Sequence, residues 1–325
     1  MLIDALIMEP IYMSPDSAVV YLCVAGVWYC YDSSKPPLGT GALGIVYIGF
    51  RCDNQDRVAI KKIHNDFVNN PVIRRIVRHE ASLIFDHPNI IKMIGWCEYT
   101  NGIGDLYIIS EYVPGVTFKD RAIQLSVVSQ ASATKQVLED IKALLPGLEY
   151  LHTRGFVHRD LKPSNIMIDN SSNVKIMDLG TVVQSYQMHQ HAMSEFVGTP
   201  SYASPEQVLG MPSDARSDIY SIGVVMYELL TGENPFNGTS REEIFHKHLY
   251  MPLPPNDKLP LKLYKIIEKA THKNVTRRYS STGELDAALT DYLAHAEIKS
   301  YPTATWLIAS ITTIIIGVLL WVFIL

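Results

Sequence analysis

Residues 158–165 read His-Arg-Asp-Leu-Lys-Pro-Ser-Asn, and an Asp-Leu-Gly triplet begins thirteen positions later, at Asp178. This short stretch combines two carboxylates, an amide and a cation. Asp160 can accept a proton from a hydroxyl group, and Lys162 can balance charge on a transferred phosphoryl group. Asn165 and Asp178 offer the oxygen ligands that Mg²⁺ prefers. The pattern therefore predicts phosphoryl-transfer chemistry.

A glycine-rich pattern lies upstream, where residues 39–46 read Gly-Thr-Gly-Ala-Leu-Gly-Ile-Val. Glycines allow backbone amides to approach phosphate oxygens closely. A strand is expected at residues 43–50, whereas a dinucleotide-binding fold would begin a helix at the third glycine. Lys61 lies on the next expected strand, where it can neutralise phosphates, and Glu80 is the only glutamate of the helix that follows. Glu80 is therefore the candidate partner of Lys61, although an ordinary surface pair is the alternative.

The rest of the chain divides into a β-rich part at residues 35–113 and a mainly helical part at residues 116–296. Apolar residues recur at helical spacing from Val137 to Leu151, and Pro146-Gly147 should kink that helix. The expected fold class is α+β. The other expected elements are strands at 57–63, 91–97 and 106–112, and helices at 71–85, 216–230, 262–273 and 282–294.

Composition excludes a disordered tail, a collagen-like fibre and a small disulfide-stabilised scaffold. The 325 residues are 47% hydrophobic and 19% charged, which is enough apolar material for a core. The net charge of −5 gives no reason to expect nucleic-acid binding. The four cysteines, which form no metal-binding or redox doublet, are expected to be reduced, intracellular thiols in the core. They are Cys23, Cys30, Cys52 and Cys97.

Two apolar segments require separate interpretations. Residues 18–31 are apolar over only 14 positions, and no positive segment precedes them, so we expect a β-hairpin around Ala25-Gly26 rather than a signal peptide. Residues 304–325 contain no charge, and as a helix they would span roughly 33 Å, enough for a hydrocarbon core of about 30 Å. Their position at the end of the printed sequence predicts a tail anchor, with a buried C-terminal helix as the alternative.

Taken together, these motifs resemble those of eukaryotic-type (Hanks-type) serine/threonine protein kinases over about residues 35–296. Residues 198–207, which read Gly-Thr-Pro-Ser-Tyr-Ala-Ser-Pro-Glu-Gln, are similar above all to the bacterial branch. The resemblance implies a two-lobed fold, with an N-lobe at about 35–113 and a C-lobe at about 114–296. It implies ATP with Mg²⁺, or alternatively Mn²⁺, as cofactors. Lys162 and Thr199 imply Ser/Thr rather than Tyr acceptors in protein substrates.

The same resemblance assigns roles to individual residues. Asp160 would be the catalytic base, assisted by Lys162, Lys61 and Glu80, while Asn165 and Asp178 would hold the metal. Glu206 would pair with Arg278, Asp218 would brace the catalytic loop, Glu111–Val113 would form the hinge for adenine, and Ser110 would be a small gatekeeper. The implied nucleotide-binding residues are Gly39, Thr40, Gly41, Gly44, Val46, Ala59, Lys61, Glu111, Val113, Asn165 and Asp178.

Some positions depart from the family pattern. Leu179 replaces the usual Phe, Ser204 replaces the commoner Ala, and the stretch from Glu80 to His87 is about two residues short. Arg159 before the catalytic Asp is typical of members controlled by phosphorylation of the activation segment. The candidate acceptors are Ser194 first, then Thr181 and Ser185, and the alternative is that these are solvated hydroxyls. An H-x-H pair, His189 and His191, could instead bind a metal, although no third ligand is evident.

The expected organisation is an N-terminal extension at 1–34, a kinase domain at 35–296, a juxtamembrane segment at 297–303 and a transmembrane helix at 304–325. The kinase domain would lie on the cytoplasmic side of the membrane, where ATP is available. Two other functions stay open. One is a membrane-tethered pseudokinase that binds nucleotide or partner proteins without catalysis. The other is a Rossmann-type oxidoreductase, which rests on the glycine pattern alone.

Overall fold

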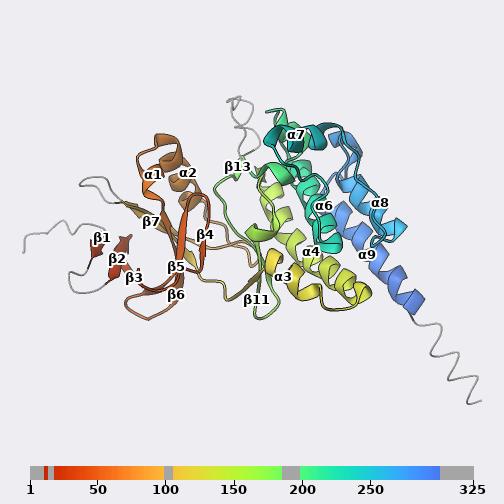
Figure 1. The fold of residues 1–325 in the computed structure, drawn as a ribbon. Coiled ribbons are helices and arrows are strands. Elements are labelled where there is room, and N and C mark those ends of the chain that lie inside the picture. The colour runs from red at the N-terminus through yellow and green to blue at the C-terminus, as the bar shows by residue number, and fades with distance from the viewer. Residues whose placement is uncertain (1–10, 14–17, 99–104, 185–197, 301–325) are drawn as a thin grey trace, which may run out of the picture.

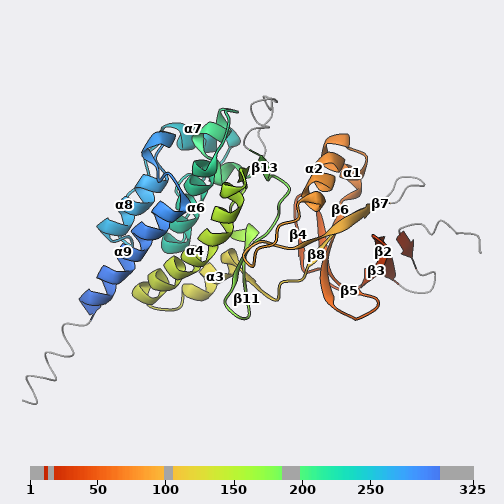
Figure 2. The ribbon, with the colours of Figure 1, turned by 180° about the vertical axis from the view of Figure 1, so that it is seen from behind.

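The structure is a computed structural model that describes residues 11–13, 18–98, 105–184 and 198–300. A β-rich part and a helical part lie next to each other, joined through the segment between β8 (Leu106–Glu111) and β9 (Gly115–Thr117) (Figure 1). The view from behind shows the same separation, with α2 (Pro71–Ser82) on the β-rich side and α4 (Gln130–Thr153) and α6 (Ala215–Thr231) on the other (Figure 2). The expected two-lobed α+β fold is therefore present.

The β-rich lobe contains one antiparallel sheet, which has eight strands within the described residues. The strand order is β1-β2-β3-β5-β6-β8-β7, and β4 pairs with β5. The strands are β1 (Ile11–Met13), β2 (Val19–Val24), β3 (Val27–Asp32), β4 (Gly39–Thr40), β5 (Gly44–Arg51), β6 (Arg57–Ile63), β7 (Met93–Glu98) and β8 (Leu106–Glu111).

The predicted N-terminal hairpin is confirmed. Strands β2 and β3 pair from Val19↔Asp32 to Val24↔Val27, and Ala25 and Gly26 form the turn with φ values of 48° and 80°. Two successive residues with positive φ are what a tight two-residue hairpin requires. The third strand of this extension, β1, was missed, because its Ile-Tyr-Met sequence is too short for a pattern.

The extension builds a second hydrophobic core on the sheet. Leu22 and Tyr31 are buried together with Tyr107 and Ile109 of β8, and the hydroxyls of Tyr31 and Tyr107 are 3.3 Å apart. This packing explains why β2 and β3 carry so many aromatic and β-branched residues. The expectation of four core cysteines was partly wrong, because only Cys97 is fully buried and the other three are half-buried.

Helix α2 (Pro71–Ser82) follows the short α1 (Asn65–Val68). Asn70 caps α2 by accepting hydrogen bonds from the backbone N–H groups of Val72 and Ile73. The expected end at residue 85 was wrong, because Leu83 is extended with ψ 96°. The backbone N–H of Leu83 still donates to the Glu80 carbonyl, and the chain leaves the helix from Leu83 onward.

The helical lobe is built around α6 (Ala215–Thr231), most of whose residues are buried. Helices α3, α4, α8 and α9 all contact α6. The other helices are α3 (Phe118–Leu125), α4 (Gln130–Thr153), α5 (Pro205–Val208), α7 (Arg241–Tyr250), α8 (Leu261–Ala270) and α9 (Thr282–Ser300). Short 3₁₀ turns are η1 (Pro163–Asn165), η3 (Pro200–Tyr202) and η4 (Val275–Arg277).

Short strands flank the loops that contain the catalytic motif and the Asp178 triplet. They are β9 (Gly115–Thr117), β10 (Phe156–Val157), β11 (Ile166–Asp169), β12 (Val174–Ile176) and β13 (Val183–Gln184). Strand β11 pairs with both β12 and β9, and β10 pairs with β13. These pairings fix both ends of the segment that runs from the catalytic motif to Asp178.

Helix α4 continues through Pro146 and Gly147, where a kink was predicted, without ending there. Burial of Leu144, Leu145 and Leu148 on either side offsets the hydrogen bond that proline cannot make. Gly147 is needed for packing, because a Cβ there would lie 2.8 Å from Asn89 Cβ.

The predicted membrane segment at residues 304–325 lies outside the described residues. In the ranges that the structure describes, no helix combines the length and apolar character needed to cross a bilayer. Ser185, Ser194, His189 and His191 also lie outside these ranges.

Candidate active site

The glycine-rich loop connects β4 to β5, and a backbone hydrogen bond joins its two ends. The N–H of Gly41 donates to the carbonyl of Gly44 at 2.8 Å, and His64 Nε2 lies 3.1 Å from the carbonyl of Gly41. A Cβ at Gly44 would clash with the Lys62 carbonyl, so the close approach of two strands requires glycine there. Strand β5 follows the third glycine as predicted, and this geometry argues against the dinucleotide-binding alternative.

Lys61 lies between two carboxylates. Its Nζ is 3.6 Å from Glu80 Oε2 and 3.9 Å from Asp178 Oδ1, so the expected pair with Glu80 is present. Burial raises the pKa of Glu80 from 4.5 to about 7, although the Lys61 ammonium opposes this shift. Burial lowers the pKa of Lys61, but Glu80 and Asp178 outweigh burial and leave that pKa above 10.5. Lys61 is therefore a charged donor at the junction of the lobes.

Asp160 is held by contacts from three sides. Its Oδ1 accepts a hydrogen bond from the backbone N–H of Thr199 at 2.7 Å. Its Oδ2 accepts hydrogen bonds from Lys162 Nζ at 3.0 Å and from Asn165 Nδ2 at 3.1 Å. Lys162 also donates to the Thr199 hydroxyl at 2.7 Å. The hydrogen bonds that the described ranges show to this carboxylate all come from donors, so it is oriented as a hydroxyl-proton acceptor must be.

Asn165 and Asp178 provide oxygen atoms suited to a divalent cation. Asn165 Nδ2 is used by Asp160, and no hydrogen bond within the described ranges reaches Asn165 Oδ1. Burial opposes ionisation of Asp178, but Lys61, His158 and Lys162 hold its pKa below 3.8. Asp178 adopts φ 52°, a left-handed conformation that is uncommon for a residue other than glycine and recurs at functional sites. A carbonyl and a carboxylate are hard ligands that fit Mg²⁺.

The catalytic loop is braced from below by Asp218, as the sequence predicted. Its two carboxylate oxygens accept the backbone N–H groups of His158 and Arg159, both at 2.9 Å. His152 Nε2 approaches Asp218 Oδ2 at 2.8 Å. Burial opposes ionisation, but these hydrogen bonds keep the pKa of Asp218 below 3.8. Arg159 is held at φ 72°, so the brace maintains a strained turn.

The segment after Thr199 is fixed by a buried ion pair. Arg278 Nη1 and Nη2 donate to Glu206 Oε1 and Oε2 at 2.7 and 2.8 Å, so the predicted pair is present, and its geometry is bidentate. Gln207 Nε2 donates to the carbonyl of Arg159 at 2.8 Å. Helix α5 therefore connects this segment to the catalytic loop.

The predicted hinge begins at Glu111, the last residue of β8, and continues to Val113. Ser110 pairs with Ala59 of β6, and Glu111 accepts Lys175 Nζ at 2.9 Å. Val113 is buried. Leu179 is fully buried too, consistent with an apolar residue in the position usually occupied by Phe.

Sequence reasoning missed several supporting residues. No motif marks His152, His64 or Glu98, and Gln207 lies at the end of the 198–207 motif without a role assigned to it. Their partners lie 20 to 66 residues away, so only the fold brings them together. Thr181 was a phosphorylation candidate, and in the structure its hydroxyl donates to the His158 carbonyl at 2.7 Å.

Comparison with known proteins supports this geometry. The family described as "Protein kinase domain" matches residues 33–293. Serine/threonine-protein kinase PknB of Mycobacterium tuberculosis is 35% identical over 263 residues, which cover 78% of this chain and 41% of that protein. PrkC of Bacillus subtilis is 33% identical over 258 residues, which cover 77% of this chain and 38% of that protein.

The similarity thus spans about two fifths of the length of these curated relatives. The range matched by the family model includes the glycine loop, the catalytic loop and the Asp178 triplet. The chain belongs to the protein kinase family.

Proposed function

We propose that the chain is an ATP-dependent serine/threonine protein kinase. The observation that carries this proposal is the Asp160 carboxylate, which is oriented by Lys162, Asn165 and the Thr199 backbone. The relatives at 33–35% identity, named serine/threonine-protein kinases, support the same acceptor class. Contact of Lys162 with Thr199 supports it further, because these are the residues by which the sequence predicted Ser/Thr acceptors.

The residues divide the work as follows. Lys61, kept charged beside Glu80, would bind phosphate oxygens under the glycine loop. Asp160 would accept the proton from the Ser or Thr hydroxyl, and Lys162 would neutralise negative charge near that proton. Asn165 and Asp178 would hold Mg²⁺, which supplies charge neutralisation on the phosphates when bound. Positioning accounts for most of the rate, since little covalent chemistry falls to the protein.

Nucleotide specificity separates this proposal from the oxidoreductase alternative. ATP with Mg²⁺ should raise the thermal midpoint of the full chain, since a ligand that binds the folded state stabilises it. NAD should leave that midpoint unchanged. Protection by NAD together with none by ATP–Mg²⁺ would favour the oxidoreductase.

Catalysis separates the proposal from the pseudokinase alternative. The full chain, with labelled ATP, Mg²⁺ and a generic basic protein, should transfer label to that protein. We also propose autophosphorylation, with Ser194 as the first candidate site, and mass spectrometry of the incubated chain would locate the sites. Protection by ATP–Mg²⁺ without any transfer would instead indicate a pseudokinase.

We further propose that residues 304–325 anchor the protein in a lipid bilayer with the kinase domain in the cytoplasm. Anchoring is supported by the sequence of this segment, which has no charge and is long enough as a helix to cross a bilayer. The cytoplasmic side is supported by the need of a kinase domain for ATP. Membranes containing the full chain should retain it after an alkaline carbonate wash, and a version ending at residue 300 should be released. Release of the full chain by the wash would exclude a spanning helix.

A further inference from the structure

Glu98, the last residue of β7, binds two arginines of α2. Arg74 Nη2 lies 2.6 Å from Glu98 Oε2, and Arg78 Nη2 lies 2.8 and 3.1 Å from the two carboxylate oxygens. The side chain of Glu98 is only 17% exposed. Burial alone would raise its pKa, but the two guanidinium groups hold the pKa below 4.5. Charge-assisted hydrogen bonds of this length are among the stronger polar contacts in proteins.

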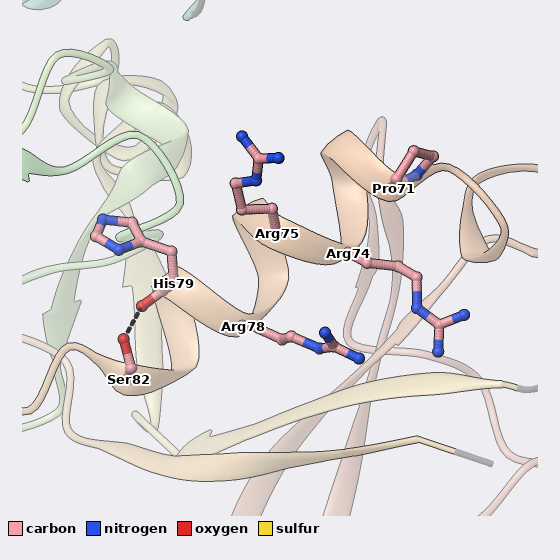
Figure 3. A pocket seen from close by; sticks show the side chains of 6 residues that line it. All are labelled: Pro71, Arg74, Arg75, Arg78, His79 and Ser82. Atoms are coloured by element: carbon pink, nitrogen blue, oxygen red, sulfur yellow. Dashed lines mark hydrogen bonds between the residues drawn. The ribbon is translucent and has the colours of Figure 1, made fainter. Parts of the chain in front are cut away.

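The contacts with Glu98 lie on one side of α2, and the other side of the helix makes different contacts. Arg74 and Arg78 leave α2 on the side of the sheet, whereas Arg75 and His79 leave it on the opposite side (Figure 3). The guanidinium of Arg78 also lies 5.1 Å from the centre of the Trp96 ring on β7. On the opposite side, His79 Nε2 is 2.7 Å from the carbonyl of Val182, just after the Asp178 triplet.

The position of α2 determines the position of Glu80. Glu80 lies two residues after Arg78 on the same helix, and its carboxylate is 3.6 Å from Lys61 Nζ. A small outward shift of α2 would therefore separate the two charges. The helix ends at Ser82, two residues after Glu80, so the helical residues that can hold Glu80 in place lie mostly before it, where Arg74 and Arg78 are.

We propose that Glu98 is a positioning residue for phosphoryl transfer: it clamps α2 to β7 through Arg74 and Arg78, and so keeps Glu80 beside Lys61. The proposal rests on the proposed kinase function. Glu98 itself contacts neither of the predicted metal ligands nor Asp160, so it acts on the reaction only through α2.

A double-mutant cycle tests this route of action. Glu98→Gln keeps the shape of the side chain and removes its charge, and it should lower kcat/KM for ATP about fivefold or more. In a Glu80→Gln background the same change should alter kcat/KM less than about twofold, because the partner that the clamp positions no longer carries charge. Glu139→Gln, which removes an exposed ion pair with Lys135 on α4, is the matched control and should change neither value. An equal loss in both backgrounds, or no loss, would overturn the proposal.

Hydrogen exchange provides a readout that does not need activity. In full-length Glu98→Gln, backbone amides of residues 71–82 should exchange faster than in the wild type, while those of α6 should be unchanged. Unchanged exchange in α2 would overturn the clamp whatever the kinetics. If the wild type transfers no phosphate at all, the proposed function fails, and faster exchange in α2 would still establish the clamp.

Discussion

Asp160→Asn should lower the rate of phosphoryl transfer by about 10²–10⁴-fold, the usual contribution of a positioned acid or base. Asparagine keeps the shape of the side chain and can still accept the Thr199 N–H, but it cannot take a proton from a hydroxyl group. Lys61, Glu80 and Asp178 are untouched, so binding of ATP–Mg²⁺ should change little. Rates with labelled ATP, and nucleotide affinity from thermal shifts, would measure the two quantities separately.

Asp169→Asn is the matched control for this substitution. Asp169 caps a turn by accepting the backbone N–H groups of Ser171 and Asn173, neither of which belongs to the proposed site. Its replacement should leave the transfer rate within about twofold, as expected of a surface substitution. Equal labelling of substrate by Asp160→Asn and the wild type would remove Asp160 from the mechanism.

Arg278→Met should lower the free energy of unfolding by about 3–5 kcal/mol, because it leaves the Glu206 carboxylate buried without its partner. The side chain of Arg278 is fully buried and that of Glu206 is 11% exposed. Adding Glu206→Gln to Arg278→Met should recover part of the loss, since a buried amide costs less than a buried charge. Urea unfolding of the three variants measures these differences.

The same pair predicts the direction of a pH effect. Burial would raise the pKa of Glu206, but Arg278 and Ser217 keep it below 4.5. The stabilisation is therefore complete above pH 4.5 and is lost as the pH falls through the lower, folded-state pKa. Arg278→Met should lack this loss of stability at acid pH.

Lys265→Met is the control for the unfolding measurement. It breaks an exposed pair with Glu268 and should lower the free energy of unfolding by about 0–1 kcal/mol. A loss in Arg278→Met no larger than this control would contradict the account.

Local patterns predicted the elements that carry the site. The glycine spacing predicted the loop and the strand after it, and the Ala25-Gly26 turn predicted the hairpin. The helical spacing from Val137 to Leu151 predicted the buried face of α4. Each of these signals lies within a few residues of chain, where backbone preferences and burial periodicity act directly.

Contacts between distant segments could not be predicted in the same way. Glu98 has no distinctive neighbours in the sequence, and its role appears only when β7 lies beside α2. The end of α2 and the continuity of α4 through Pro146 depend on packing that overrides local preference. Glu80 was the candidate partner of Lys61 because it is the only glutamate of the next helix, whereas the pair Glu206–Arg278 was predicted only through resemblance to a family.

Phosphoamino-acid analysis tests the central claim most directly. The full-length protein would be incubated with γ-labelled ATP, Mg²⁺ and a protein substrate containing Ser, Thr and Tyr, beside the Asp160→Asn variant. We predict phosphoserine or phosphothreonine in the substrate with the wild type and almost none with the variant. Unlabelled substrate, label confined to tyrosine, or equal label with both proteins would contradict the account.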